Sequence, residues 1–279
     1  MTLTLTDESP ATDRPLAGTW CVVLGASSGM GRAVARRVAA DGAGVLGVHF
    51  DTAQRDDEVA ALVDELTAHR VPVRFVNANA ASPRTRAEVV DVLTGLGAGA
   101  GRTVLLHSLA FGSLRPFVAP PAAEPGAVEL VEPKQLTMTV EVMAHSLVWW
   151  VRDLLEADLL PAGSHVLAMT SAGDSRVSPS YGAVSAAKSA LLSHVRQLAV
   201  ELAPRGVAVN ALRAGVTRTP AFDRIPGSDA IARTALAANP HGRLTVPEDV
   251  ADAVATLATL PSSWVTGNVV AVDGGEGLT

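Results

Sequence analysis

A strand, a glycine-rich turn and a helix follow one another near the start of the chain, and this order constrains the fold more than any other feature. The apolar run Trp20–Leu24 predicts a buried strand, and Arg32–Ala40 has the pattern of a helix. Between them stand Gly25, Gly29 and Gly31, spaced Gly-x-x-x-Gly-x-Gly. Such glycines let the backbone turn tightly and approach a pyrophosphate, whose charge then meets the free amides of the helix N-terminus. The pattern indicates a dinucleotide site, although a simple tight turn uses similar glycines.

Apolar runs alternate with helical patterns along the rest of the chain. Further buried strands are predicted at residues 44–48, 73–76, 103–106, 165–170, 206–212 and 268–272. Strands that alternate with helices of about 10 to 15 residues imply a parallel sheet covered on both faces. We therefore predict an α/β fold, a single Rossmann-like domain whose doubly wound parallel sheet has about seven strands and helices on both faces. The residues that follow these strands would share one rim of the sheet, among them Gly25, His49, Asn79, Ser108, Ser171 and Gly215.

The predicted domain spans residues 17–279 and is preceded by a flexible N-terminal tail, residues 1–16. The tail is polar, contains two prolines and lacks the basic start and apolar centre of a signal peptide. Two segments break the alternation of strands and helices, near 112–133 and 220–242. The first is rich in proline and is predicted to be either a wall that faces the substrate or a surface excursion. The second could be a mobile lid.

Composition narrows the classes of function. Of 279 residues, 48% are apolar and 18% are charged, which suits a large core. The net charge of −6 argues against a nucleic acid partner, because phosphate binding requires a basic face. The single cysteine, Cys21, is expected in the core. Because one cysteine cannot form a disulfide within the chain, the sequence fits a reducing compartment. Since no stretch of about 18 apolar residues is free of charge, we predict no membrane partner and a cytoplasmic location. We also predict no metal site.

Tyr181 is the only tyrosine of the chain, and Lys188 follows it by seven residues at the start of a helix predicted at Ala186–Leu202. This spacing places a phenol and an ammonium about two helical turns apart on one face. Because the unperturbed pKa of a phenol is about 10, a nearby cation is needed for the phenol to donate a proton close to neutral pH. The pattern therefore predicts acid chemistry.

The end of the second strand bears on the form of the cofactor. A carboxylate there would hold the adenosine ribose hydroxyls and favour NAD. Asp51 could do so but lies two positions late, and His49 occupies the usual place. An imidazole tolerates a 2′-phosphate that a carboxylate would repel, so we predict NADP(H) in preference to NAD(H). Arg32 and Arg55 are either partners of that phosphate or solvated surface residues.

With these segments in order, the chain resembles the short-chain dehydrogenase/reductase family over roughly residues 17–277. The matching segments are the glycine turn, Ser171 with Lys188 downstream, and Val272-Asp-Gly-Gly275 near the end. The resemblance implies a homodimer or homotetramer.

The resemblance also implies roles for individual residues. Lys188 would bind the nicotinamide ribose and lower the pKa of a tyrosine, Thr219 would bind the carboxamide, and Asn79 would lie near the adenine. The predicted catalytic residues are Tyr181, Lys188 and Ser171. The predicted cofactor-binding residues are Gly25, Ser27, Ser28, Gly29, Met30, Gly31, His49, Phe50, Asn79, Ala80, Ser108, Leu109, Ala110, Lys188, Gly215, Val216 and Thr219.

Three segments depart from the commoner family pattern. Tyr181 and Lys188 are spaced Tyr-x6-Lys instead of Tyr-x-x-x-Lys. The fourth strand is followed by His-Ser-Leu-Ala-Phe at 107–111, and the sixth by Ala-Gly-Val-Thr-Arg-Thr at 214–219. All three resemble the enoyl-thioester reductase branch of the family. Ser171, in contrast, stands where carbonyl reductases of the family have their catalytic serine.

These features lead to three hypotheses. The first is NADPH-dependent reduction of the C=C bond of an α,β-unsaturated acyl thioester, carried by CoA or acyl carrier protein, with a cyclic substrate such as 1-cyclohexenylcarbonyl-CoA as one option. In that reaction hydride goes to the β-carbon, and a displaced phenol can meet the oxyanion that develops on the thioester oxygen. The second is an NADP-dependent ketone or alcohol oxidoreductase, and the third is a non-catalytic NADP-binding regulator.

Overall fold

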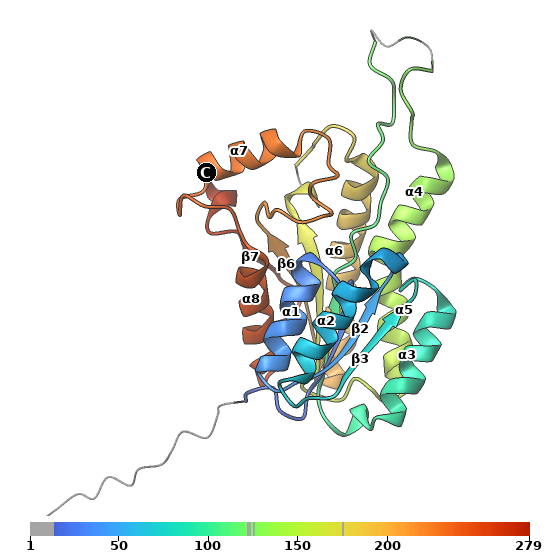
Figure 1. Ribbon diagram of the computed structural model, residues 1–279, viewed down its shortest axis with the longest axis vertical. Coiled ribbons are helices and arrows are strands. Elements are labelled where there is room, and N and C mark those ends of the chain that lie inside the picture. The colour runs from blue at the N-terminus through green and yellow to red at the C-terminus, as the bar shows by residue number, and fades with distance from the viewer. Residues whose placement is uncertain (1–13, 122–123, 125, 175) are drawn as a thin grey trace, which may run out of the picture.

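All strands of the sheet run parallel. The computed structural model describes residues 14–121, 124, 126–174 and 176–279. Within this part of the chain, seven strands form one sheet in the order β3-β2-β1-β4-β5-β6-β7 (Figure 1). The strands are β1 (Trp20–Leu24), β2 (Gly44–His49), β3 (Val73–Asn77), β4 (Thr103–His107), β5 (His165–Ser171), β6 (Ala208–Ala214) and β7 (Val269–Val272). The predicted α/β fold is confirmed, and the strand order reverses between β1 and β4.

Helices cover both faces of the sheet. One face carries α1 (Gly29–Ala40), α2 (Asp56–Thr67) and α8 (Pro247–Thr259), and the other carries α3 (Pro83–Gly95), α5 (Ser146–Glu156) and α6 (Gly182–Leu202). Two further helices, α4 (Pro133–Val140) and α7 (Ser228–Ala238), lie toward the end of the molecule where the strands have their carboxyl ends (Figure 1). Within the described residues, no helix is long and apolar enough to span a membrane.

The alternation of side chains along β1 explains why two cores form. Trp20, Val22 and Leu24 belong to the core beneath α3, α5 and α6, whereas Cys21 and Val23 belong to the core beneath α1, α2 and α8. A strand points successive side chains to opposite faces, so a continuous apolar run fills both cores. Cys21 is only 1% exposed, and burial raises the pKa of its thiol to about 12. It is therefore a core residue, as predicted.

Two predicted boundaries change. The helix predicted to begin at Ala186 begins at Gly182, which places Tyr181 at its N-terminal end. The predicted tail extends too far, because Leu16 is fully buried in the core and its amide donates to the carbonyl of Asp41. Residues 1–13 of the predicted tail lie outside the described residues. Leu16 was missed because a single large apolar residue that follows a polar segment gives no periodic pattern.

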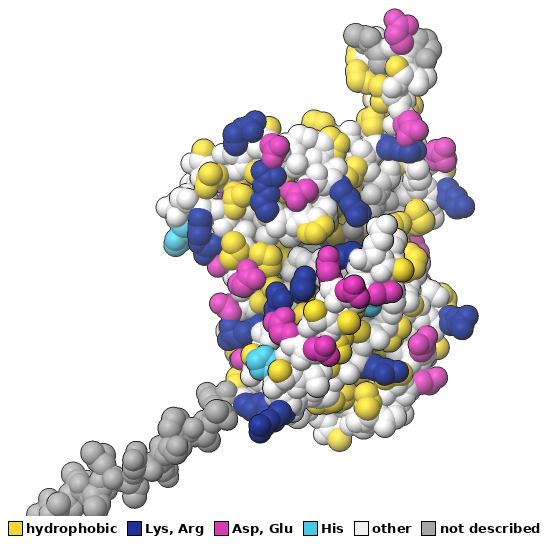
Figure 2. All heavy atoms as spheres, in the orientation of Figure 1, with side chains coloured by type: hydrophobic (Ala, Val, Ile, Leu, Met, Phe, Trp, Pro, Cys, Tyr) yellow, Lys and Arg dark blue, Asp and Glu magenta, His cyan; other side chains and the backbone are white. Residues whose placement is uncertain are grey.

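The described residues of the proline-rich segment, 112–121, 124 and 126–132, project from the body and are here called the arm (Figures 1 and 2). Its two legs are linked where the amide of Val131 donates to the carbonyl of Pro116, and where Arg115 forms an ion pair with Glu129. The first leg starts near the carboxyl edge of the sheet, where residues 108–111 connect it to β4. The second predicted loop contains a helix, α7, so only its flanks are irregular.

Candidate active site

The glycine turn is shaped for close approach of a ligand backbone. Gly25 has φ of +91°, and a Cβ there would lie 2.5 Å from the carbonyl oxygen of Ser108. A Cβ at Gly31 would collide with the carbonyl oxygen of Gly25. Helix α1 begins at Gly29, and the side chain of Ser28, its N-cap residue, does not cap it within the described residues. The first-turn amides are therefore open to an anion, as a dinucleotide pyrophosphate requires.

Segments that are far apart in sequence meet around this turn. The amide of Ser108, directly after β4, donates to the carbonyl of Leu24 at the end of β1. The side chain of Thr219, beyond β6, reaches within 3.3 Å of where a Cβ of Gly29 would lie. Ligands of such sheets bind at the point where the strand order reverses, and this rim lies at that point. The residues present thus fit a dinucleotide cofactor.

The end of β2 differs from the arrangement predicted. The side chain of His49 is only 5% exposed, and its Nδ1 lies 2.8 Å from Oδ2 of Asp51. Arg55 donates to Oδ1 of Asp51 at 3.0 Å and to the carbonyl of Ser27 in the glycine turn at 3.3 Å. Hydrogen bonds from Ser27 and His49 and the charge of Arg55 outweigh burial and lower the pKa of Asp51. The carboxylate and the guanidinium, rather than the imidazole, thus face the glycine turn.

The remaining predicted cofactor residues differ in their surroundings. Met30 and Leu109 pack against the cores, and Phe50, Asn79 and Ala110 are exposed at the rim. Three of the predicted residues already form hydrogen bonds within the protein. The carbonyl of Ala80 accepts from Nε1 of Trp150, and the amide of Val216 donates to Oε2 of Glu276. Oδ1 of Asn79 accepts from the amide of Ala81. Ser27, Ser28, Gly215 and Thr219 lie along the same rim.

Tyr181 and Ser171 come together, as predicted. A side-chain hydrogen bond joins them, and it opposes the larger effect of burial, which raises the pKa of the phenol. The turn after β5 makes room for the ring, because a Cβ at Gly173 would collide with Tyr181. Met143, Val184 and Ala187 form a small apolar cluster against which Tyr181 also packs. The phenol therefore presents its hydroxyl on a polar side and its ring on an apolar one.

Contrary to the prediction, Lys188 does not lower the pKa of Tyr181. Its Nζ is buried and donates to the carbonyl oxygen of Met169 at 2.7 Å. Burial lowers the pKa of Lys188 to about 8, and the charge of Asp174 opposes that shift. The expected lowering of the pKa of Tyr181 by Lys188 was wrong for the protein alone, because seven residues of helix separate the two by about 10 Å of rise.

Sequence reasoning missed an ion pair beneath the site. The side chain of Asp174 is only 1% exposed and accepts hydrogen bonds from both Nε and Nη2 of Arg213 on β6, at 3.0 to 3.2 Å. Thr170 donates to the same carboxylate at 3.0 Å. The signal was present, since an arginine inside an otherwise apolar strand requires a buried partner. The pair fixes the turn that carries Gly173 under Tyr181.

His107 lies at the end of β4 and is fully buried. Ser146 donates to the carbonyl of Val142 at 2.7 Å, so its hydroxyl oxygen accepts from Nε2 of His107 at 2.8 Å. The Nδ1 atom carries the lone pair and has no partner among the described residues. Burial, and secondarily the charge of Lys188, lower the pKa of His107 to about 3. Ser146 follows a π-helical turn, Glu141–His145, of the kind often found at functional sites.

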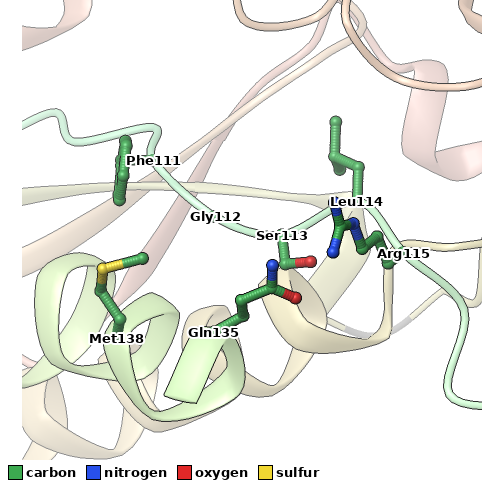
Figure 3. A pocket seen from close by; sticks show the side chains of 7 residues that line it. All are labelled: Phe111, Gly112, Ser113, Leu114, Arg115, Gln135 and Met138. Atoms are coloured by element: carbon green, nitrogen blue, oxygen red, sulfur yellow. The ribbon is translucent and has the colours of Figure 1, made fainter. Parts of the chain in front are cut away.

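A pocket of about 380 Å³ opens between the base of the arm and α4 (Figure 3). Its lining residues are Phe111, Gly112, Ser113, Leu114, Arg115, Gln135 and Met138. Leu114 also packs against the apolar cluster that contacts Tyr181. Leu114 thus belongs both to the lining of the pocket and to the side chains packed on the cluster that Tyr181 contacts.

The parallel sheet, the glycine turn at its switch point and the Ser171–Tyr181 pair with Lys188 define a nicotinamide-dependent oxidoreductase. The comparisons agree. The family model for enoyl-(acyl carrier protein) reductase matches residues 25–276. The chain therefore belongs to the short-chain dehydrogenase/reductase family, in its enoyl reductase-like branch.

Individual relatives carry out more than one reaction. The chain is 34% identical over 269 residues to a cis-4-hydroxycyclohexanecarboxylate dehydrogenase of Sinomonas cyclohexanicum, covering 91% of this chain and 94% of that protein. An enoyl-[acyl-carrier-protein] reductase (NADH) of Aquifex aeolicus has a similar structure, with a TM-score of 0.78 and 22% identity over 95% of this chain and 98% of that one. A short-chain dehydrogenase of Burkholderia cenocepacia in complex with NADP has a TM-score of 0.77 and 24% identity, covering 94% and 99%. The structural similarities establish the fold.

Proposed function

We propose that the protein reduces the C=C bond of an α,β-unsaturated acyl thioester, carried by CoA or acyl carrier protein, with NADPH. The observation that carries this proposal is the placement of Tyr181. Its ring packs on an apolar cluster, and its spacing from Lys188 is that of the enoyl reductase branch. The match of the family model over residues 25–276 supports the same choice.

In the proposed reaction, each residue of the site has a separate role. The cofactor, when bound, supplies the hydride. Tyr181 donates a hydrogen bond to the thioester oxygen while negative charge develops there, and Ser171 orients the phenol. The ammonium of Lys188 would hold the nicotinamide ribose hydroxyls of the bound cofactor. The α-carbon finally receives a proton from Tyr181 or from water.

The preference for NADPH now depends on Arg55 instead of His49, because Arg55 is the cation that pairs with Asp51, the carboxylate that by itself would repel a 2′-phosphate. Nε and Nη2 of Arg55 contact Glu58, whose side chain is 57% exposed, so this pair contributes little to stability. A 2′-phosphate could displace Glu58 and take these donors. Arg32, in the first turn of α1, has a buried Nε without a partner among the described residues and offers a second cation.

We expect Arg55→Leu to lower kcat/KM for NADPH about tenfold and to leave kcat/KM for NADH unaffected. A clear NADH preference of the unaltered protein would contradict this assignment.

A second candidate is the reduction of a ketone or the oxidation of an alcohol. The hydrogen bond between Ser171 and Tyr181 favours it, as does the similarity to a dehydrogenase of a hydroxylated cyclohexane ring. Turnover separates the two. We expect NADPH oxidation with crotonyl-CoA or 1-cyclohexenylcarbonyl-CoA and none with acetoacetyl-CoA. The reverse result would establish the second candidate.

A third candidate, a non-catalytic NADP-binding regulator, requires that the phenol be dispensable. It would gain support if Tyr181→Phe left cellular function unchanged. The cytoplasmic location and the homodimeric or homotetrameric state remain predictions, and light scattering tests the latter.

A further inference from the structure

Phe117 lies on the turn that carries the catalytic tyrosine. A Cβ at Gly182, the first residue of α6, would lie 2.6 Å from Cζ of Phe117 and 2.7 Å from its Cε2. The aromatic ring therefore rests directly on the backbone next to Tyr181, and the glycine makes the contact possible. The remainder of the ring is open, since Phe117 is 53% exposed.

The segment leading to Phe117 is held in place on the body. A Cβ at Gly112 would lie 2.7 Å from Thr139 and 2.8 Å from Val184, so this backbone is pressed onto α4 and α6. The amide of Ser113 donates to Oγ1 of Thr139 at 3.1 Å. One residue before Phe117, the two legs of the arm are joined by a backbone hydrogen bond to Pro116. The segment that carries the ring of Phe117 is thus fixed at Gly112 and Ser113 and again at Pro116.

The surroundings of Tyr181 differ on its two sides. Ser171 contacts the hydroxyl, and this side accommodates the polar thioester group. On the other side Leu114 packs with Tyr181 on the apolar cluster, and Phe117 follows it along the same segment. If the thioester oxygen of a substrate contacts Tyr181, the rest of its acyl chain would extend from the C=C bond toward Leu114 and Phe117. The adjoining pocket of about 380 Å³ is near the lower end of the range for ligand pockets.

We propose that Phe117 determines substrate specificity by closing the acyl end of the site, so that short and ring-shaped acyl groups are accepted and long straight chains are rejected. This inference depends on the proposed reduction of enoyl thioesters. The rejection is steric, because a chain that continues beyond the ring must displace a side chain anchored on Gly182 and on the legs of the arm.

The test compares kcat/KM for crotonyl-CoA, 1-cyclohexenylcarbonyl-CoA, trans-2-octenoyl-CoA and trans-2-dodecenoyl-CoA in four proteins. These are the unaltered protein, Phe117→Ala, Gly182→Ala and the control Val118→Ala, whose side chain is 76% exposed on the same leg. We expect Phe117→Ala to raise kcat/KM for dodecenoyl-CoA about tenfold and to change that for crotonyl-CoA less than about threefold. Gly182→Ala, which pushes the ring off the turn, should move the profile in the same direction. Val118→Ala should keep the original profile.

The possible failures are distinguishable. If the unaltered protein reduces enoyl thioesters and Phe117→Ala retains its dependence on chain length, the role of Phe117 is refuted and the proposed function stands. If the unaltered protein had equal kcat/KM for crotonyl-CoA and dodecenoyl-CoA, the role of Phe117 would also be refuted and the proposed function would stand. If no enoyl thioester is reduced while ketones are, the proposed function itself fails. Thermal melting of each variant verifies that it is folded.

Discussion

The cofactor side and the acyl side of the site are built in different ways. On the cofactor side, Gly25, Gly31 and the carbonyl of Ser108 leave room only for backbone, and the chain is held between buried parallel strands. On the acyl side, exposed apolar side chains such as Phe111 and Phe117 project from a segment without regular secondary structure. We therefore expect recognition of the cofactor to depend on backbone geometry and recognition of the proposed acyl substrate to depend on individual side chains. Substitutions should separate the two.

The largest effect is expected at Tyr181. Tyr181→Phe removes the group that we propose meets the developing oxyanion, so kcat should fall about 1,000-fold. The dissociation constant for NADPH, measured by fluorescence titration, should change less than about twofold, because the phenol lies on the acyl side. Turnover equal to that of the unaltered protein would exclude the phenol from the mechanism.

Gly31→Ala tests the cofactor side. Its Cβ would collide with the carbonyl of Gly25, so the turn must open and the dissociation constant for NADPH should rise about 100-fold. Gly95→Ala is a matched control at the end of α3, where no described atom lies within 4 Å of the added Cβ. Equal cofactor affinities of the two variants would show that the turn does not shape the site.

The Asp174–Arg213 pair connects the two sides, because it fixes the turn under Tyr181 and faces Lys188. The pKa of Lys188 is about 8, so the ammonium is present below that pH, and activity should fall on the alkaline side with a midpoint near 8. Asp174→Asn removes the charge that raises this pKa, so the midpoint should move to lower pH and kcat should fall about tenfold. Asp91→Asn, at an exposed position of α3, is the control. A purely structural role would lower kcat without moving the midpoint.

At acid pH the expected effect is on stability instead of activity. His107 has a pKa near 3 in the folded protein and about 6.5 when unfolded, so the unfolded state binds more protons between these values. The free energy of unfolding should therefore fall as pH drops below 6.5, and His107 should account for roughly 3 kcal/mol of this loss by pH 4. Urea unfolding at both pH values should show a smaller acid loss in His107→Asn. An equal loss in both proteins would mean that His107 is accessible to protons.

The strands and the glycine turn were largely predictable from sequence, and the contacts between separate elements were not. Apolar runs bounded by glycine predict strands and turns because their period follows from backbone geometry. The pairing of Asp174 with Arg213, the tautomer of His107 and the contact of Phe117 with Gly182 join residues from separate elements, and no local pattern encodes such contacts. The role expected of His49 was revised for the same reason, since its burial and its bond to Asp51 depend on tertiary packing.

The most direct test follows the hydride. Stereospecifically deuterated NADPH is incubated with an equal mixture of a 2-enoyl-CoA and the matching 3-ketoacyl-CoA, and the position of deuterium in the products is determined by NMR. If the protein reduces double bonds, deuterium will appear on the β-carbon of the saturated thioester. Deuterium on the carbinol carbon of a 3-hydroxyacyl-CoA, with the enoyl-CoA unchanged, would contradict that account.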